Sequence, residues 1–227
     1  MQEAGDAAGG AGCAHRRLGP DHAQAHINLG NALLQKRETD AAIAEYGKTL
    51  ELPFDHAETL YSMANALRQK GDVEEAIIQY RTAIALRPDY ANAHNNLANS
   101  LRQVGRIEEA VHEYEAALKG EPESILAQNN LAWLLATSSN ASVRDGAKAV
   151  RLAEQADRLS GGNDPIILHT LAAAYAENRQ FPEAVEAAKR ALELADANGI
   201  TSLAESLRSK LALYQAGSPY HETSATQ

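Results

Sequence analysis

Apolar and polar residues alternate along the chain in a pattern that predicts pairs of short helices. In the stretch from 57 to 88, one face of a first predicted helix carries four apolar side chains, Leu60, Met63, Ala64 and Leu67. That helix is expected to end at Gly71, because glycine readily adopts the left-handed conformation that closes a helix. A second apolar stripe runs from Ala76 to Ile84 and stops before Pro88. The predicted unit is therefore a helical hairpin.

The hairpin pattern recurs with a fixed period. Blocks that begin at Ala23, Ala57 and Ala91 follow one another in steps of 34 residues. Four columns of identical residues run through these blocks: Tyr46, Tyr80 and Tyr114; Ala42, Ala76 and Ala110; Leu33, Leu67 and Leu101; Asn31, Asn65 and Asn99. A period of this length indicates a solenoid in which each repeat is one supersecondary unit.

Two further blocks continue the columns less regularly. The fourth begins near Ile125, and its second half arrives five residues late because of the polar stretch from Thr137 to Gly146. A loop between two helices absorbs such an insertion at little cost. The fifth block runs from about Pro165, and Pro182 suits the first turn of its second helix.

The columns predict an array of five repeats. We expect a disordered or truncated leader over 1–19, a repeat array over 20–216 and a flexible tail over 217–227. The array divides into repeats near 23–56, 57–90, 91–124, 125–164 and 165–200, followed by a capping helix at 201–216. One hairpin cannot bury its apolar face alone, so neighbours must stack. The predicted fold class is all-α, an α-solenoid that forms a right-handed superhelix with a concave inner surface.

The composition narrows the range of partners and locations. Against 30 Asp and Glu there are 21 Lys and Arg, and the net charge of −9 opposes contact with phosphates, so we expect no nucleic acid partner. The lone cysteine, Cys13, can form neither an intrachain disulfide nor a multi-thiolate zinc site. No stretch reaches the roughly 18 consecutive apolar residues of a membrane span. We therefore expect no membrane insertion and a cytoplasmic location.

The polar residues give no sign of an enzyme. Of the eight histidines, His22 and His26 share a helical spacing but have no acidic or cysteine companion at a recognised metal spacing. Four others fall in different columns, which suggests no recurring cluster: His56, His94, His112 and His169. The sequence contains no nucleophile elbow and no phosphate-binding glycine loop. We predict a non-catalytic protein without cofactor or metal.

The 34-residue helical pairs and their columns resemble the tetratricopeptide repeat family over about residues 20–200. The stretch from Asn130–Trp133 through Ala147 to Tyr214–Gly217 further resembles the C-terminal repeat block of large bacterial proteins of this family. Some of those proteins carry membrane-embedded transferase regions upstream. The resemblance implies binding of a protein partner, usually an extended peptide or a helix in the concave groove.

A set of amides is the candidate binding site. If the first helices line the groove, each of the first three carries two amide side chains four residues apart, and therefore on the same face of the helix. The three pairs and the two arginines beside them are Asn31 and Gln35, Asn65 and Gln69, Asn99 and Gln103, with Arg68 and Arg102. A carboxamide both donates and accepts hydrogen bonds, so this ladder could hold an extended, acidic segment with little demand on its sequence. The alternative is that these residues are ordinary solvated positions of the repeat.

Two other features bear on the ligand. Trp133 replaces the column asparagine in repeat four, where it either anchors a ligand or packs against the lengthened loop. Family members that grip the C-terminal carboxylate of chaperones use a lysine one turn before the groove asparagine. The corresponding residues here are Ile27, Tyr61 and Asn95, which disfavours a chaperone carboxylate clamp.

Three hypotheses for the function stay open at the level of sequence. The first is a scaffold for protein–protein interaction that binds an extended peptide or helix in its groove. The second is a recognition or regulatory fragment of a larger bacterial transferase or membrane protein. The third is a self-associating structural array, which would make the protein a homo-oligomer.

Overall fold

The computed structural model describes residues 20–52 and 56–223, and within these ranges its regular structure is entirely helical. The chain divides into two compact units, one ending at Leu86 and the other beginning at Arg87. Each unit is described by itself. The leader expected over 1–19 lies outside the described residues.

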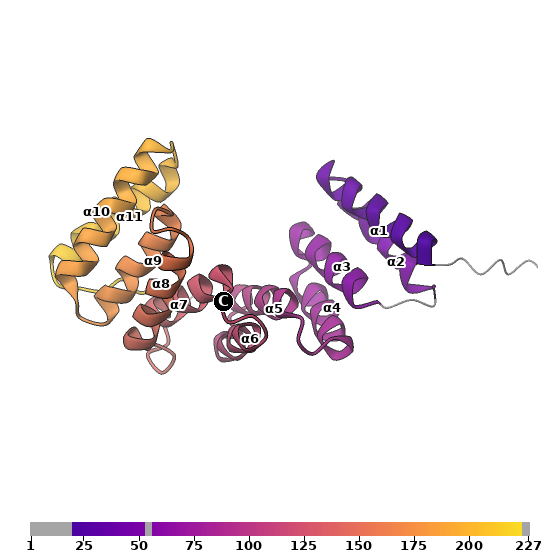
Figure 1. Cartoon of the computed structure of the whole chain (residues 1–227), viewed down its shortest axis with the longest axis horizontal. Coiled ribbons are helices and arrows are strands. Elements are labelled where there is room, and N and C mark those ends of the chain that lie inside the picture. Colours follow the sequence, from indigo (N-terminus) through magenta and orange to yellow (C-terminus); the bar gives the residue numbers. More distant parts are fainter. Residues whose placement is uncertain (1–19, 53–55, 224–227) are drawn as a thin grey trace, which may run out of the picture. The chain divides into compact units, whose positions relative to one another are not determined.

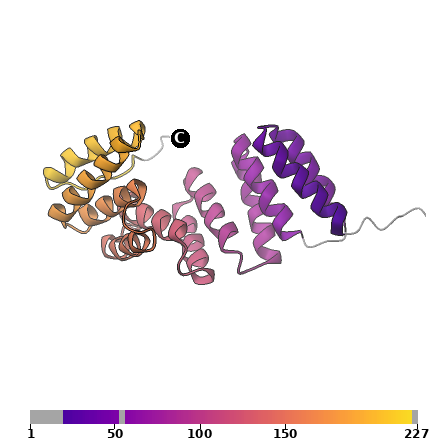
Figure 2. The same ribbon diagram turned by 45° about the horizontal axis from the view of Figure 1, so that its top comes forward.

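The first unit contains two helical hairpins. Helix α1 (Pro20–Gln35) packs against α2 (Thr39–Leu50), and α3 (Ala57–Lys70) packs against α4 (Val73–Leu86). Contacts between α2 and α3 bring the two hairpins side by side (Figures 1 and 2).

The second unit contains three hairpins and a final helix. The hairpins are α5 (Ala91–Gln103) with α6 (Ile107–Gly120), α7 (Ile125–Thr137) with α8 (Gly146–Leu159), and α9 (Pro165–Glu177) with α10 (Phe181–Ala197). Helix α6 contacts α7, α8 contacts α9, and α11 (Thr201–Gln215) packs against α10 (Figure 1). The predicted all-α fold class of stacked hairpins is confirmed, while the handedness of the superhelix stays a prediction. Among the helices at 20–52 and 56–223, none combines the length and apolar content that crossing a membrane requires.

Small side chains allow the two helices of each hairpin to lie close together. The alanine column of the second helices has no exposed surface: Ala42, Ala76, Ala110, Ala149 and Ala184. The facing column of the first helices is equally buried at Ala64, Ala98, Ala132 and Ala172. In the first hairpin this place is taken by Gly30, where an added Cβ would lie 2.5 Å from Cε1 of Tyr46. The Tyr46 ring therefore fills the space that a side chain at Gly30 would need.

The turn between the two helices requires a left-handed residue. Gly71 and Gly105, predicted to end the first helices of their hairpins, have φ angles of 101° and 78°. The equivalent positions in the first and fifth blocks are Arg37 and Arg179, with φ angles of 63° and 64°. The turn geometry is thus kept even where the sequence lacks the glycine that would reveal it.

A buried tyrosine and an asparagine tie the two helices of each of the first three hairpins. The Tyr hydroxyl of the second helix donates to the Asn Oδ1 of the first over 2.6 to 2.7 Å, in the pairs Tyr46–Asn31, Tyr80–Asn65 and Tyr114–Asn99. The three tyrosine side chains are fully buried, and a buried hydroxyl without a partner would be costly. Burial raises the pKa of Tyr46 and Tyr114 to about 12, so both hydroxyls keep their protons.

A histidine and a glutamate form a second recurring link. His26 Nδ1 lies 2.7 Å from Glu45 Oε2, and His94 Nδ1 lies 2.6 Å from Glu113 Oε2 at the same positions two blocks later. His94 Nε2 also faces the carbonyl oxygen of Pro88 at 3.0 Å. A carboxylate and a carbonyl oxygen both accept hydrogen bonds, so two acceptors facing the two ring nitrogens favour the protonated imidazolium form of His94. The bond to Glu113 accordingly raises the pKa of His94, although burial opposes the shift.

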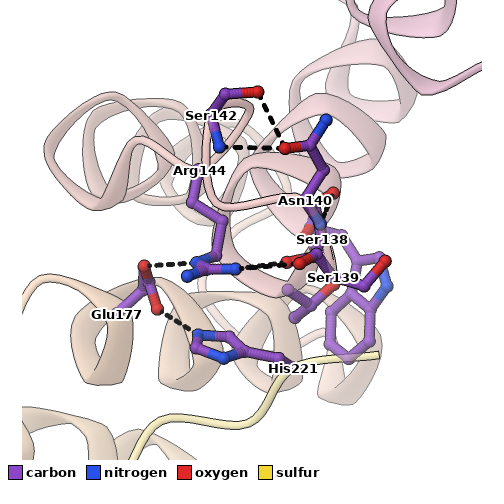
Figure 3. Close-up of polar contacts among 9 residues, drawn as sticks. Ser138, Ser139, Asn140, Ser142, Arg144, Glu177 and His221 are labelled. Carbon is purple, nitrogen blue, oxygen red and sulfur yellow. Dashed lines mark hydrogen bonds and ion pairs between the residues drawn. The ribbon is translucent and has the colours of Figure 1, made fainter. Parts of the chain in front are cut away.

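The lengthened loop of the fourth block is held in place by side chains. Arg144 donates from Nη1 to the carbonyl oxygen of Ser138 over 2.9 Å and from Nε to Glu177 Oε1 over 3.0 Å (Figure 3). The Asn140 side chain accepts from the amide and hydroxyl of Ser142. At Gly146, where the loop ends, an added Cβ would lie 2.7 Å from the backbone nitrogen of Asn178. The insertion is therefore fixed against the next repeat.

The tyrosine–asparagine bond predicts a specific pattern of stabilities. Asn99→Ala is expected to lower the free energy of unfolding by about 1–3 kcal/mol, because it leaves the buried Tyr114 hydroxyl without its acceptor. Tyr114→Phe is expected to cost about 1 kcal/mol, since the half-buried Asn99 amide can turn to water. The double variant should cost less than the sum of the two. Urea unfolding followed by emission of Trp133, the sole tryptophan, measures all three values, and strict additivity would contradict the role of the bond.

The His94 imidazolium predicts that the stability of the second unit depends on pH. Because folding raises the pKa of His94, its contribution is complete below the ordinary pKa of about 6.5 and disappears as pH rises through the folded value. Urea unfolding at about pH 5.5 and about pH 8.5 should show the loss. The variant His94→Leu/Glu113→Gln copies Leu60 and Gln79 of the second block, and it should lack this component. An equal pH dependence in both proteins would refute the assignment.

Candidate functional site

The residues expected to bind a peptide lie on the first helices of the hairpins. In the first unit, α1 carries Asn31 and Gln35, and α3 carries Asn65, Arg68 and Gln69; in the second unit, α5 carries Asn99, Arg102 and Gln103. The side chains of Gln35, Arg68, Gln69 and Gln103 are exposed, whereas Arg102 is half-buried.

The asparagines of this set already have partners inside the protein. Each of the three Oδ1 atoms accepts a hydrogen bond from the buried tyrosine of its own hairpin. One acceptor site of each amide oxygen is therefore used inside its own hairpin.

The fourth and fifth hairpins lack this pair altogether. In the fourth hairpin, Ala153 occupies the tyrosine position and Trp133 the asparagine position. In the fifth hairpin, Ala188 occupies the tyrosine position and Ala173 the asparagine position. The two columns change together because an asparagine oxygen is required only where a tyrosine hydroxyl must be satisfied. The surface of α7 and α9 is thereby free to carry other side chains.

The chain after α11 returns along the second unit. Residues 218–223, which we call the tail segment, pass back beside α9 and α7 toward α5 (Figure 1). The backbone N–H of Glu222 donates to the carbonyl oxygen of Thr137 over 2.7 Å. Thr137 ends α7, where carbonyl groups have no partner within the helix. These contacts belong to residues 218–223 of the tail expected to be flexible, and 224–227 lie outside the described residues.

The carboxylate of the tail segment meets two donors. Trp133 Nε1 donates to Glu222 Oε1 over 2.8 Å, and Arg102 Nη1 lies 3.5 Å from the same oxygen. Arg102 belongs to the set expected from sequence, and Trp133 was expected either to anchor a ligand or to pack against the loop. The structure brings both residues to one acidic side chain.

An aromatic group lies beside this carboxylate. The ring centroid of Trp133 lies 4.7 Å from that of His169 and 6.3 Å from that of Tyr220. Lys210 on α11 is only 8% exposed, and its Nζ lies 4.3 Å from the Tyr220 ring centroid. Burial lowers the pKa of Lys210, and burial together with the Lys210 charge lowers the pKa of His169 to about 3. His169 is therefore a neutral ring at physiological pH.

His221, which lies between Tyr220 and Glu222, contacts helix α9. His221 Nε2 lies 2.7 Å from Glu177 Oε2, and the second oxygen of Glu177 accepts from Arg144 of the lengthened loop (Figure 3). The tail segment is therefore recognised through its backbone, an acid, an aromatic ring and a ring N–H. We call Arg102, Trp133, His169, Glu177 and Lys210 the tail-binding surface.

Most of this surface was not predicted from the sequence. Periodicity does not reveal three of its residues, because none of them recurs with the same contacts at the equivalent position of another repeat: His169, Glu177 and Lys210. The joint change of the asparagine and tyrosine columns at Trp133 and Ala153 was the available signal. Within residues 20–52 and 56–223, no three His, Cys, Asp or Glu side chains form a group that could hold a metal ion. The surface offers groups for recognition.

Family comparisons cover the repeats of both units. Family models described as tetratricopeptide repeats match residues 13–53, 95–164 and 167–195, and one described as a TPR repeat matches residues 64–105. A search of the curated proteins found no match to the chain.

Solved structures share the fold at low sequence identity. MamA from Desulfovibrio magneticus is 19% identical, with 78% of this chain and 97% of that chain covered and a TM-score of 0.66. A thermophilic TPR protein of Thermus thermophilus is 24% identical, with 86% and 99% covered and a TM-score of 0.57. The first TPR of RPAP3, bound to an HSP90 peptide, is 23% identical, with 52% and 94% covered and a TM-score of 0.50.

The family matches reach into each of the five repeat blocks, and the solved structures share their helical hairpins. The chain therefore belongs to the tetratricopeptide repeat family.

Proposed function

We propose that the protein is a non-catalytic scaffold that binds an extended peptide segment of a protein partner along the first helices of its hairpins. One observation carries the proposal. In the second unit, the first helices α5, α7 and α9 hold an extended segment through Arg102, Trp133 and Glu177. A surface that binds such a segment in the same chain has the chemistry to bind one from a partner.

The comparisons support the same type of ligand. The first TPR of RPAP3 is bound to the HSP90 peptide SRMEEVD, whose sequence is rich in acidic residues. In this chain, Arg102 and the Trp133 N–H provide the groups for an acidic side chain. A clamp for a chaperone carboxylate stays disfavoured, since Ile27, Tyr61 and Asn95 occupy the lysine positions.

The proposed contacts are assigned separately in each unit. In the first unit they are Asn31, Gln35, Asn65, Arg68 and Gln69; in the second they are Asn99, Arg102 and Gln103. Amide donors contact the backbone of a peptide and tolerate many sequences, while the arginines favour acidic residues. We further propose that the protein acts in the cytoplasm, without cofactor and without nucleic acid. Self-association and origin from a larger bacterial transferase or membrane protein stay as alternative predictions.

Peptide display with the full chain tests the proposal. Selection from a library of random peptides should enrich extended acidic sequences. In the full chain carrying Glu222→Gln, which removes the carboxylate that lies against Arg102, Arg102→Gln should weaken their binding by about tenfold or more, because it removes a charge-assisted hydrogen bond worth about 1.5–3 kcal/mol. Arg151→Gln, which changes an exposed arginine on the second helix α8, is the matched control and should leave affinity unchanged. Enrichment of no peptide, or equal effects of the two substitutions in calorimetric titration, would contradict the proposal.

A further inference from the structure

We propose that the tail segment competes with the ligand inside the same chain, because it occupies the tail-binding surface on which the second unit binds an extended peptide of a partner. The preferred peptide has three consecutive residues: an aromatic residue, a hydrogen-bond donor and an acidic residue. This inference rests on the proposed function and specifies the ligand and its regulation. The tail segment reads Tyr220, His221, Glu222 at these three positions, and each has a separate contact on the second unit.

The three contacts follow the alternation of an extended chain. In extended backbone, successive side chains point to opposite sides, so residues two apart share one side. Tyr220 and Glu222 both reach Trp133, one by its ring and one by its carboxylate. His221 lies between them and contacts Glu177 instead. A peptide from another protein with the same alternation would present its side chains to the same groups.

Charge fixes the chemistry of two of the three positions. Glu222 lies between the Trp133 N–H and the Arg102 guanidinium, so this place favours a carboxylate. Lys210 is buried and hydrogen bonded to the Ser206 hydroxyl over 2.5 Å, and the Tyr220 ring covers its charge. A buried ammonium gains from an aromatic face, which favours an aromatic residue two positions before the acid.

The middle position and the backbone add less specific contacts. Glu177 already accepts from Arg144 and has its second oxygen facing His221, so this place favours a hydrogen-bond donor. The bond from the Glu222 N–H to the Thr137 carbonyl uses a group that every residue except proline has. The tail-binding surface therefore requires an aromatic residue and an acidic residue in the peptide, and the rest of the peptide sequence has little effect on binding.

The covalent connection makes the tail segment an effective competitor. Only two turn residues, Ala216 and Gly217, separate its first residue from the end of α11 at Gln215. Short connections give effective concentrations on the order of millimolar, so even a weak intramolecular contact keeps the surface mostly occupied. A partner peptide then binds with an apparent affinity reduced by the fraction of molecules whose surface is open.

The sole tryptophan makes the test direct. Trp133 contacts both Tyr220 and Glu222, so its emission reports whether the tail segment is bound. The test variant is the full chain with Tyr220→Ala and Glu222→Gln, which leaves the tail-binding surface intact. The matched control is Thr223→Ala, an exposed neighbour on the same segment. Far-ultraviolet circular dichroism checks that both variants keep their helices.

The probe is a labelled synthetic peptide, Ser-Pro-Tyr-His-Glu-Thr, with the sequence of residues 218–223 and blocked ends. In the double variant, Trp133 emission should shift to the red, and iodide should quench it more strongly than in the wild type. Fluorescence anisotropy should show the probe binding at least about tenfold more tightly to the double variant than to the wild type or to Thr223→Ala. A probe with Ala for Tyr and Gln for Glu should not bind.

Each contrary result has a distinct meaning. Unchanged Trp133 emission and quenching in the double variant, or equal probe affinity for all three proteins, would overturn the inference. Displayed peptides that bind the wild type and the double variant equally would overturn the competition and leave the proposed function standing. If the double variant binds neither the probe nor any displayed peptide, the proposed function itself fails. Wild-type dimers that dissociate on tail substitution would show that the segment binds a second copy, which also overturns the intramolecular competitor.

Discussion

The close contact between the two helices of a hairpin is the constraint on which the rest of the structure depends. Alanine or glycine on both helices brings the backbones together, and in the first three hairpins a tyrosine fills the remaining space. The buried tyrosine brings a hydroxyl that must be satisfied, and an asparagine on the facing helix satisfies it. One packing choice therefore determines three columns of the repeat, and it uses an acceptor site of each asparagine inside the hairpin.

The last two hairpins solve the same packing problem with alanine alone. Ala153 and Ala188 need no polar partner, so the position of the asparagine can change without cost to the hairpin. In the fourth block that position holds Trp133, the residue that contacts both the acid and the aromatic ring of the tail segment. Within the second unit, Trp133 contacts the tail segment from the position that the structural asparagine occupies in the first three hairpins.

The hairpins, their alanine columns and the glycine turns were predictable because they depend on contacts that recur every 34 residues. The bond between Tyr114 and Asn99 was not predicted, although both columns were identified, since periodicity gives positions and not partners. The link between His94 and Glu113 was not predicted, because such a link occurs in only two blocks. The position of the tail segment had no periodic signal at all. Its side-chain hydrogen bonds join residues 44 to 120 positions apart, and only the folded chain brings those residues together.

The inserted loop of the fourth block limits how this array can be rearranged in evolution. Repeat proteins gain and lose whole units readily when each unit interacts with its neighbours in the same way. Here Arg144 and Gly146, which flank the end of the inserted loop, are fitted to Glu177 and Asn178 of the following repeat. Duplication or deletion of the fourth repeat alone would separate these partners, so the fourth and fifth repeats can be inherited only as a pair.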